Sequence, residues 1–331
     1  MIARRSVWSD PEVQKLAADF IPAADAVHRL QRGRDPEALL FQLMAEHGHY
    51  GGRTVPTDTR QGTYALTPSG RFLASINTND AKRMAQMLET ALATWHALTR
   101  NERLMADDPA LKTREVVRVE RFFPHNGLVL RVFSRDLPRE NIGKGWQATA
   151  WNQDFAWFKK SEARLFLPQD FSDKSTHNVP DAVARRIARF HLVDNVRGQT
   201  SPYDNNALRR ASMQMQVTDR KGSIVSIRLE GEFKTSTSGQ WSVSGYRDMN
   251  KPSQQDRGVE VRLLGRAKYD QSKQRFIEFE MVAIGTRWGG TQYNGRGDDL
   301  PAAQIGFAFT LAGDSPSERV TPAHFWGYGW R

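Results

Sequence analysis

The stretch Val225–Phe233 reads Val-Ser-Ile-Arg-Leu-Glu-Gly-Glu-Phe, an alternation of apolar or small residues with polar ones. Successive side chains of a β-strand point to opposite faces of its sheet, so this period of two predicts a strand with one buried and one solvated face. The same alternation recurs in four other segments, which cover residues 212–217, 259–269, 277–283 and 305–311. Because half-buried strands are typical of antiparallel sheets, we predict one of roughly six to nine strands.

Two of these strands carry a glycine at an inward-facing place, Gly231 and Gly265. A glycine inside a strand gives up packing, which indicates a bulge or sharp curvature of the sheet. Hairpin turns are predicted at Asp219–Gly222 and Asp270–Lys273. A helix over residues 179–190 is expected to cover the concave side, so we predict a curved sheet that is barrel-like or sandwich-like.

Towards the N-terminus the apolar period changes from two to that of a helix. Asp10-Pro11-Glu12 and Asp35-Pro36-Glu37 each place a capping aspartate before a proline and a glutamate, which predicts two helix starts. A short strand is expected over residues 21–27 between them. A β-hairpin over residues 63–76 and a long helix after Asp80 follow.

A polar stretch then separates the two patterns and predicts a domain boundary. We place a first domain at residues 1–98, a linker at 99–113, and a β-rich domain with one covering helix at 114–331. The order in the first domain is helix, strand, helix, hairpin, helix. The fold class expected for the whole chain is α+β.

The first domain resembles the thioredoxin-like superfamily, once a first strand in or before residues 1–7 is added. Trp8–Val13 is similar to the segment in which a tryptophan precedes the redox Cys-x-x-Cys motif, and Thr59–Tyr64 lies where that superfamily carries its cis-proline. Arg189–Asn195 resembles uncharacterised bacterial proteins that join such a domain to a β-rich one. The resemblance implies a thioredoxin-like α/β fold for residues 1–98.

The redox activity does not follow from the resemblance, because the chain contains no cysteine. Ser9 stands near the first cysteine position, and no proline precedes Thr63. Thiol exchange requires a thiolate that attacks a disulfide sulfur. The chain is therefore not a thiol–disulfide oxidoreductase. No Gly-x-Ser-x-Gly elbow, phosphate-binding loop or dinucleotide fingerprint is present, and we expect no cofactor.

The corner where thioredoxins do chemistry holds Trp8, Ser9, Asp10, Arg60 and Gln61 in this sequence. A helix N-terminus offers unpaired N–H groups to an anion, and an arginine adds a fork of donors for a carboxylate or phosphate. These residues are our candidates for binding a peptide or an anion. The alternative is a vestigial corner packed against the β-rich domain.

Histidines supply a second, weaker candidate. His47 and His49 stand two residues apart, and Asp58 could complete a metal site as a third ligand. The alternative is a pair of surface histidines on a glycine-rich loop. His191 lies between apolar residues and is expected in the core, as are the aromatic residues of Phe325–Trp330.

The net charge of +10 is spread rather than clustered. Residues 1–105 hold 13 basic and 11 acidic side chains, and residues 106–331 hold 34 and 26. This interleaving argues against nucleic-acid binding, which uses a basic patch. No apolar run is long enough for a transmembrane segment. We expect a cytoplasmic protein if the chain is complete, and a periplasmic or secreted one if a signal peptide was removed upstream.

These observations favour a non-redox binding or scaffold protein whose partner is a protein, a peptide or a small apolar ligand. The alternative is a hydrolase or metalloenzyme with its site at the domain junction. No pairing of a nucleophile with a base supports the alternative. We therefore favour binding over catalysis.

Overall fold

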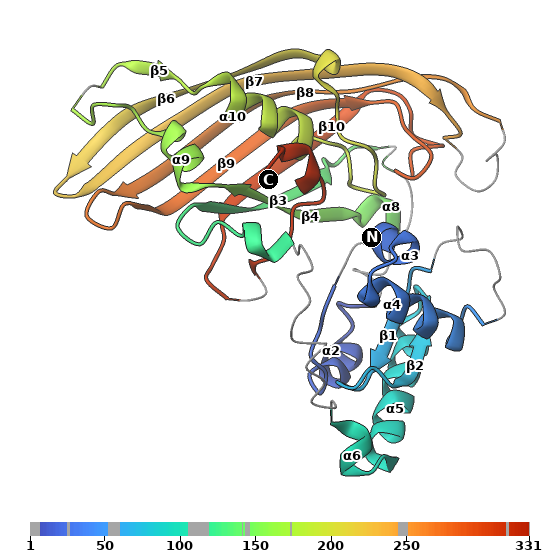
Figure 1. Cartoon of the computed structure of the whole chain (residues 1–331). Coiled ribbons are helices and arrows are strands. Elements are labelled where there is room, and N and C mark those ends of the chain that lie inside the picture. The colour runs from blue at the N-terminus through green and yellow to red at the C-terminus, as the bar shows by residue number, and fades with distance from the viewer. Residues whose placement is uncertain are drawn as a thin grey trace. The chain divides into compact units, whose positions relative to one another are not determined.

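The structure is a computed structural model in which the contacts divide the chain into two compact units, Met1–Val116 and Val117–Arg331. The first holds helices around a short hairpin and the second a large sheet (Figure 1). The described residues are 7–24, 27–51, 60–104, 119–140, 142, 146–172, 174–243, 251–315 and 318–330.

The first unit contains short helices and one hairpin. The elements are α2 (Pro11–Ala17), α3 (Val27–Arg32), α4 (Pro36–His47), β1 (Thr63–Leu66), β2 (Phe72–Ile76), α5 (Ala81–Ala97) and α6 (Arg100–Arg103). Asp10, Asp35 and Asp80 accept hydrogen bonds from the first turns of α2, α4 and α5, which confirms these helix starts. The predicted strand over residues 21–27 is wrong. Ile21 is 96% exposed in an irregular segment, and Val27 begins α3.

Helices lie on both faces of the hairpin. Ala65 and Ala74 face each other across β1 and β2 and pack in one apolar cluster with Val13 of α2 and Met84 of α5. Tyr64, which points the other way along β1, meets Phe41 of α4 with ring centroids 5.3 Å apart. The unit therefore has three layers. In the stretch predicted as a linker, Thr99 caps α6, and residues 105–118 lie outside the described part of the chain.

The second unit is built on an eight-stranded sheet in which every pairing is antiparallel. The spatial order is β4-β3-β10-β9-β8-β7-β6-β5. The strands are β3 (Leu128–Asp136), β4 (Trp151–Phe158), β5 (Thr176–Asn178), β6 (Leu208–Lys221), β7 (Ile224–Trp241), β8 (Ser253–Asp270), β9 (Arg275–Trp288) and β10 (Ala303–Leu311). Short helical turns join them, at η1 (Val119–Phe122), α8 (Trp146–Thr149), α9 (Lys160–Ala163), η2 (Arg164–Phe166), η4 (Asn205–Ala207) and η7 (Phe325–Tyr328).

The antiparallel sheet of the prediction is confirmed, but its barrel-like or sandwich-like closure is wrong. The sheet is single and open, with β4 and β5 at its two edges. A helix occupies the concave face instead of a second sheet (Figure 1). This is the predicted covering helix, formed by α10 (Asp181–Arg186) and one π-helical turn, η3 (Ile187–His191).

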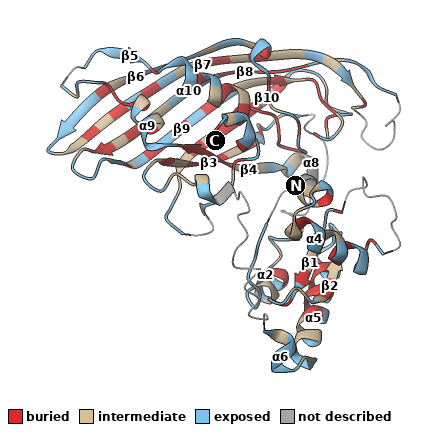
Figure 2. Cartoon of the chain, in the orientation of Figure 1, coloured by how far each residue is buried: buried red, intermediate tan, exposed pale blue. Residues whose placement is uncertain are grey.

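The main core lies between this helix and the sheet. Val183 and Ile187 are buried in the same cluster as the inward-facing residues of β7 and β8, such as Leu229 and Leu263. Buried and exposed residues alternate along the long strands (Figure 2). The period of two in the sequence thus reflects one face against the helix and one against solvent.

Gly265 faces inward as predicted, but it does not lie at a bulge. No register shift occurs at Gly265 itself, and the closest atoms to its side-chain position belong to β9 rather than to the helix. A Cβ there would lie 2.8 Å from the carbonyl oxygen of Glu280 and 2.6 Å from Cγ of Met281. The glycine is therefore required by the close approach of the neighbouring strand.

Candidate functional site

An open groove of ≈ 500 Å³ follows β2 in the first unit. It is lined by His47, Gly48, His49, Phe72, Leu73, Ala74, Ser75, Ile76, Arg83, Gln86, Met87 and Thr90. All five residues of β2 contribute, although successive side chains of a strand point to opposite faces. A cavity under one face would meet alternate residues only. The groove therefore runs along the edge of the strand.

Among the described residues, β2 pairs with β1 and with no other strand. After Ile76 the chain turns directly to Asp80, which caps α5, so no following strand covers this edge. An unpaired edge presents a row of backbone N–H and C=O groups to whatever lies beside it. The groove thus offers main-chain hydrogen bonds along its floor.

The two walls of the groove come from different helices. Arg83, Gln86 and Thr90 are exposed residues on α5 and form one wall. The turn after α4 forms the other, and His49 fixes it. The backbone N–H of His49 donates to Ser75 Oγ at 3.0 Å, and its ring stacks on Tyr64 with centroids 5.1 Å apart.

The ionisable residues along the groove are all basic: His47, His49 and Arg83. No aspartate or glutamate is among the described residues that line it. Arg83 carries a permanent positive charge, and its sign favours an anionic ligand over a cationic one.

The predicted site at Asp10 is used by the chain itself. The Asp10 carboxylate accepts from the backbone N–H groups of Glu12 at 2.9 Å and Val13 at 3.2 Å. Gln14 donates from its side chain to the carbonyl oxygen of Trp8 at 3.0 Å. The N–H groups that were expected to bind an anion therefore already have an acceptor. For Trp8 and Ser9 a ligand-binding role stays a prediction.

Arg60 lies in the interior, with 1% of its surface exposed. Its guanidinium pairs with Glu46 of α4 at 3.1 Å, and its carbonyl oxygen accepts from the Tyr64 hydroxyl at 2.6 Å. The carbonyl oxygen of Gln61 accepts from the Tyr50 hydroxyl at 2.9 Å. Arg60 and Gln61 thus tie the start of β1 to α4 and its following turn, and their role in ligand binding stays a prediction.

The histidine pair of the predicted metal site lies at the groove. His47 lines it, while the Nδ1 atom of His49 is held 2.8 Å from Ser75 Oγ. Asp58 lies outside the described residues. Within the described part of the chain, no three His, Asp or Glu side chains gather as metal ligands would. The metal site stays a prediction.

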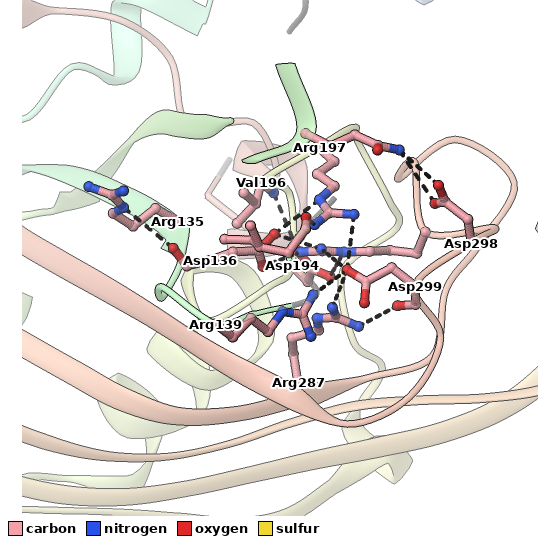
Figure 3. Close-up of polar contacts among 12 residues, drawn as sticks. Arg135, Asp136, Arg139, Asp194, Val196, Arg197, Arg287, Asp298 and Asp299 are labelled. Atoms are coloured by element: carbon pink, nitrogen blue, oxygen red, sulfur yellow. Dashed lines mark hydrogen bonds and ion pairs between the residues drawn. The ribbon is translucent and has the colours of Figure 1, made fainter. Parts of the chain in front are cut away.

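The second unit holds a buried cluster of arginines and aspartates (Figure 3). Its centre is Arg296, whose guanidinium makes five hydrogen bonds to three carboxylates. Asp136 ends β3, Asp194 follows η3, and Asp299 belongs to the same loop as Arg296. Burial opposes ionisation of Asp194, but Arg296 more than offsets it and lowers the pKa of that carboxyl.

Three further arginines converge on Asp299 (Figure 3). Arg139 and Arg197 approach Oδ2 of that carboxylate to 2.6 and 2.9 Å, and Arg287 binds it as well. A buried charge is tolerated when it is paired in this way. Every donor of Arg296 is engaged, so we interpret the cluster as a structural joint between the β9–β10 loop, the end of β3 and the segment after η3.

The C-terminal residues Phe325–Trp330, here named the C-terminal strap, cover the edge strand β4. The hydroxyl of Tyr328 accepts from the backbone N–H of Trp157 at 3.4 Å, and Arg186 donates to the Trp157 carbonyl oxygen at 3.4 Å. Phe325 and Trp330 are buried against Trp157, which confirms the predicted aromatic core for these two residues, whereas Tyr328 is half-buried and Trp326 is exposed.

His191 is buried beneath the strap, as predicted, and its Nε2 atom lies 2.6 Å from the Tyr328 hydroxyl oxygen. Burial lowers the pKa of His191 to about 3, and the nearby His324 and Arg186 add to this effect. His324 is half-buried, and desolvation lowers its pKa to about 4. Both rings are therefore neutral at pH 7 and contribute to packing.

Sequence reasoning missed the wall residues Arg83, Gln86 and Thr90. The available signal was a hairpin that leads straight into a helix, so that no strand directly follows β2 to pair with its second edge. Comparisons of the chain with protein-family models, with curated proteins and with solved structures found no match. In the described part of the chain, the helices fall short of the length and apolar character that crossing a membrane requires.

Proposed function

We propose that this chain is a non-redox binding protein whose first unit takes an extended acidic peptide segment as an added strand beside β2. The observation that carries the proposal is the lining of the groove by five consecutive strand residues. Addition of a strand to an open sheet edge is a recurring mode of peptide recognition, in which backbone hydrogen bonds supply affinity. The groove volume of ≈ 500 Å³ also falls within the usual range of ligand sites.

The basic wall residues supply the preference for acidic segments. Arg83 is exposed on α5, and His47, the last residue of α4, lines the groove as well. Exposed charges of this kind contribute modestly to affinity and more to the choice of partner. In this arrangement β2 pairs with the peptide backbone, and the wall residues select an acidic peptide.

We further propose that the first unit is a thioredoxin-like module without redox chemistry. The layer order supports this, since α2 and α5 pack on one face of the β1–β2 hairpin and α4 on the other. The missing cysteines remove thiol exchange but leave a sheet edge that can hold a peptide. Binding is thus the activity that this fold can retain.

The test uses a fluorescein-labelled octapeptide of alternating valine and glutamate. Fluorescence polarisation should report saturable binding to the full chain, and the backbone amide resonances of residues 72–76 should shift on titration. Arg83→Glu should weaken binding about fivefold, since exposed charges contribute on the order of 1 kcal/mol. Lys82→Glu is the matched control, because Lys82 is exposed on the same helix but does not line the groove.

Peptide variants test the pairing directly. In an added strand, the N–H groups of alternate peptide residues point to the neighbouring strand and the others point to solvent. N-methylation of one alternate set should abolish binding, whereas N-methylation of the other set should leave it nearly unchanged. Equal effects of the two sets, or resonance shifts confined to the second unit, would show that β2 does not pair with the peptide.

A further inference from the structure

A narrow crevice, here named the basic crevice, lies beside the turn that joins β8 to β9 in the second unit. Its lining includes the cations Lys160, Arg164 and Arg275 and the amides Asn126 and Gln274. These residues come from three separate segments: the turn before β3, the helical turns α9 and η2, and the β8–β9 turn with the start of β9. The space inside is ≈ 10 Å³, about what one water-sized oxygen atom needs.

The charge around the basic crevice is of one sign. No aspartate or glutamate is among the described residues that line it. The carboxylate of Asp270, whose backbone lies opposite Arg275, instead accepts from the backbone N–H groups of Ser272 at 2.9 Å and Lys273 at 3.2 Å. Within the described part of the chain, Arg164 and Arg275 thus have no carboxylate partner.

Cations on the neighbouring strands are arranged differently. Each solvent-accessible cation of β7 and β8 pairs with a glutamate of the sheet, and these cations are Arg228, Lys234, Arg262, Arg266 and Lys268. Like charges that gather at one place repel each other, and an anion bound between them removes that repulsion. The unpaired cations of the basic crevice therefore indicate an anionic ligand.

Two further features favour binding at this place. The buried rings of Tyr269 and Phe276 also line the crevice, with centroids 5.2 Å apart, and an apolar wall strengthens the field of charges beside it. Gln274 has a φ of +51°, which no other described non-glycine residue shares in sign. Such a backbone is costly and persists where its surroundings require it. Its amide oxygen accepts from Lys160 at 3.0 Å, which holds the ammonium group at the crevice.

We propose that the basic crevice binds a phosphoryl dianion, either inorganic phosphate or a small phosphate monoester. One oxygen enters the crevice, and the others lie among Lys160, Arg164 and Arg275. Three positive charges suit a dianion better than a monovalent carboxylate. Guanidinium groups donate paired hydrogen bonds to phosphate oxygens, and the ammonium group adds a point charge. Because only one oxygen fits inside, an ester group would point to solvent.

Titration of the full chain at constant ionic strength tests the site. Sodium phosphate should shift the backbone amide resonances of Gly127 and Gln274, with half-saturation at about 1 mM or below. Phenyl phosphate should saturate at a similar concentration, because its ring remains outside. Acetate, with a single charge, should bind at least about tenfold more weakly. Saturation by only one of the two phosphates would identify which source the site takes.

Variants test the assigned cations. Arg164→Gln and Arg275→Gln should each raise the half-saturating phosphate concentration about fivefold, and a triple variant that adds Lys160→Gln should not saturate. Arg220→Gln is the matched control, because Arg220 is an exposed arginine of β6 outside the crevice. This control should bind phosphate like the wild type. Circular dichroism verifies that each variant is folded.

The peptide groove gives an internal control, since it belongs to the first unit. Affinity for the valine–glutamate peptide should be the same in all of these variants. Resonance shifts that never saturate, or that acetate reproduces at the same concentrations, would overturn the proposal. So would a loss of phosphate affinity in Arg220→Gln as large as in Arg275→Gln.

Discussion

The edge strands β4 and β2 differ in whether other parts of the chain cover their unpaired backbone groups. At β4 the backbone N–H and C=O of Trp157 are met by Tyr328 and Arg186, two groups from elsewhere in the chain. At β2 the strand borders an open groove along its whole length. Exposed edges invite pairing with other chains, and proteins normally block them. This contrast supports the proposal that the open edge of β2 is a binding site.

The covered edge is held by more than apolar burial. Arg186 forms an ion pair with Glu162, and its guanidinium lies 4.6 Å from the centre of the Tyr328 ring. Burial opposes ionisation of Glu162, but Arg186 offsets it and lowers the pKa of that carboxyl. The indole N–H of Trp330 donates to the same carboxylate at 3.1 Å. The covered edge therefore depends on a few specific side chains and can be opened by changing them.

Removal of the Tyr328 ring should open the covered edge and have the largest effect on stability. Tyr328→Ala deletes a half-buried ring from the strap and leaves the Trp157 N–H without its acceptor, at a cost of about 3–5 kcal/mol. Urea unfolding followed by tryptophan fluorescence measures the loss. Tyr328→Phe keeps the ring and should cost only about 1–2 kcal/mol.

Tyr328→Ala also tests whether the cover over the edge of β4 prevents aggregation. Tyr328→Ala should form β-rich aggregates under conditions where Tyr328→Phe stays dispersed. Binding of the valine–glutamate peptide should be unchanged in both, because the groove belongs to the first unit. If Tyr328→Ala is as stable as the wild type, the strap does not protect this edge.

Lowering the pH should also destabilise the covered edge, with a smaller loss of stability than Tyr328→Ala causes. A buried neutral histidine binds fewer protons in the folded state than in the unfolded state, so stability is full above about pH 6.5 and falls as pH is lowered towards the folded pKa. For His191 and His324 that pKa is about 3 and about 4. Each should cost on the order of 2–3 kcal/mol by pH 4.

Between pH 6.5 and 4.5 most carboxylates stay ionised, so the slope in that window reports the histidines. His324→Gln should remove roughly half of the slope of unfolding free energy against pH. Urea titrations at pH 7, 6 and 5 measure it. A stability that is flat from pH 7 to 5 in the wild type would contradict neutral burial of the two rings.

A substitution in the middle of the sheet should lower stability without exposing a strand edge. Gly265→Val introduces a Cβ 2.8 Å from the Glu280 carbonyl oxygen and should cost about 1–3 kcal/mol. The urea midpoint should fall, but aggregation should not increase at equal fraction folded, because the C-terminal strap still covers β4. Gly222→Ala is the control on the same sheet, since its side-chain position is open and only its φ of +58° is unfavourable.

The alternation and helix-start signals predicted much of the fold because they are local. The inward-facing series of β7 and β8, the capped starts of α2 and α4, and the covering helix all follow from neighbouring residues. Closure of the sheet could not be predicted in this way. It depends on whether β4 and β5 meet, and these two strands lie at opposite ends of the eight-stranded sheet.

The buried ion-pair cluster and the candidate site show the same limit. Asp136 and Arg296 are 160 residues apart in the chain, and no sequence pattern around either residue predicts their contact. The groove needs three separate features, an unpaired strand edge, the wall of α5 and the turn at His49, to come together in space. The composition excluded thiol exchange in the first unit, because the chain has no cysteine, but it did not predict a binding groove at the edge of β2.

Blocking the open edge should have the smallest effect on stability and the clearest effect on binding. Gln86 is exposed on α5 and lines the groove, so Gln86→Trp places a large ring where the peptide would lie. Substitutions at exposed positions away from specific contacts usually change stability by less than about 0.5 kcal/mol. The urea midpoint should stay near that of the wild type, while affinity for the valine–glutamate peptide falls more than about tenfold. Glu89→Trp on the same helix is the control, because Glu89 is exposed but outside the groove.

Gln86→Trp and Tyr328→Ala should have opposite effects. Tyr328→Ala opens the covered edge of β4, which lowers stability strongly and leaves peptide binding unchanged. Gln86→Trp fills the open edge of β2, which changes stability little and abolishes most of the peptide binding. Retained affinity in Gln86→Trp would mean that the peptide does not lie along β2, and the open edge would then need a different explanation.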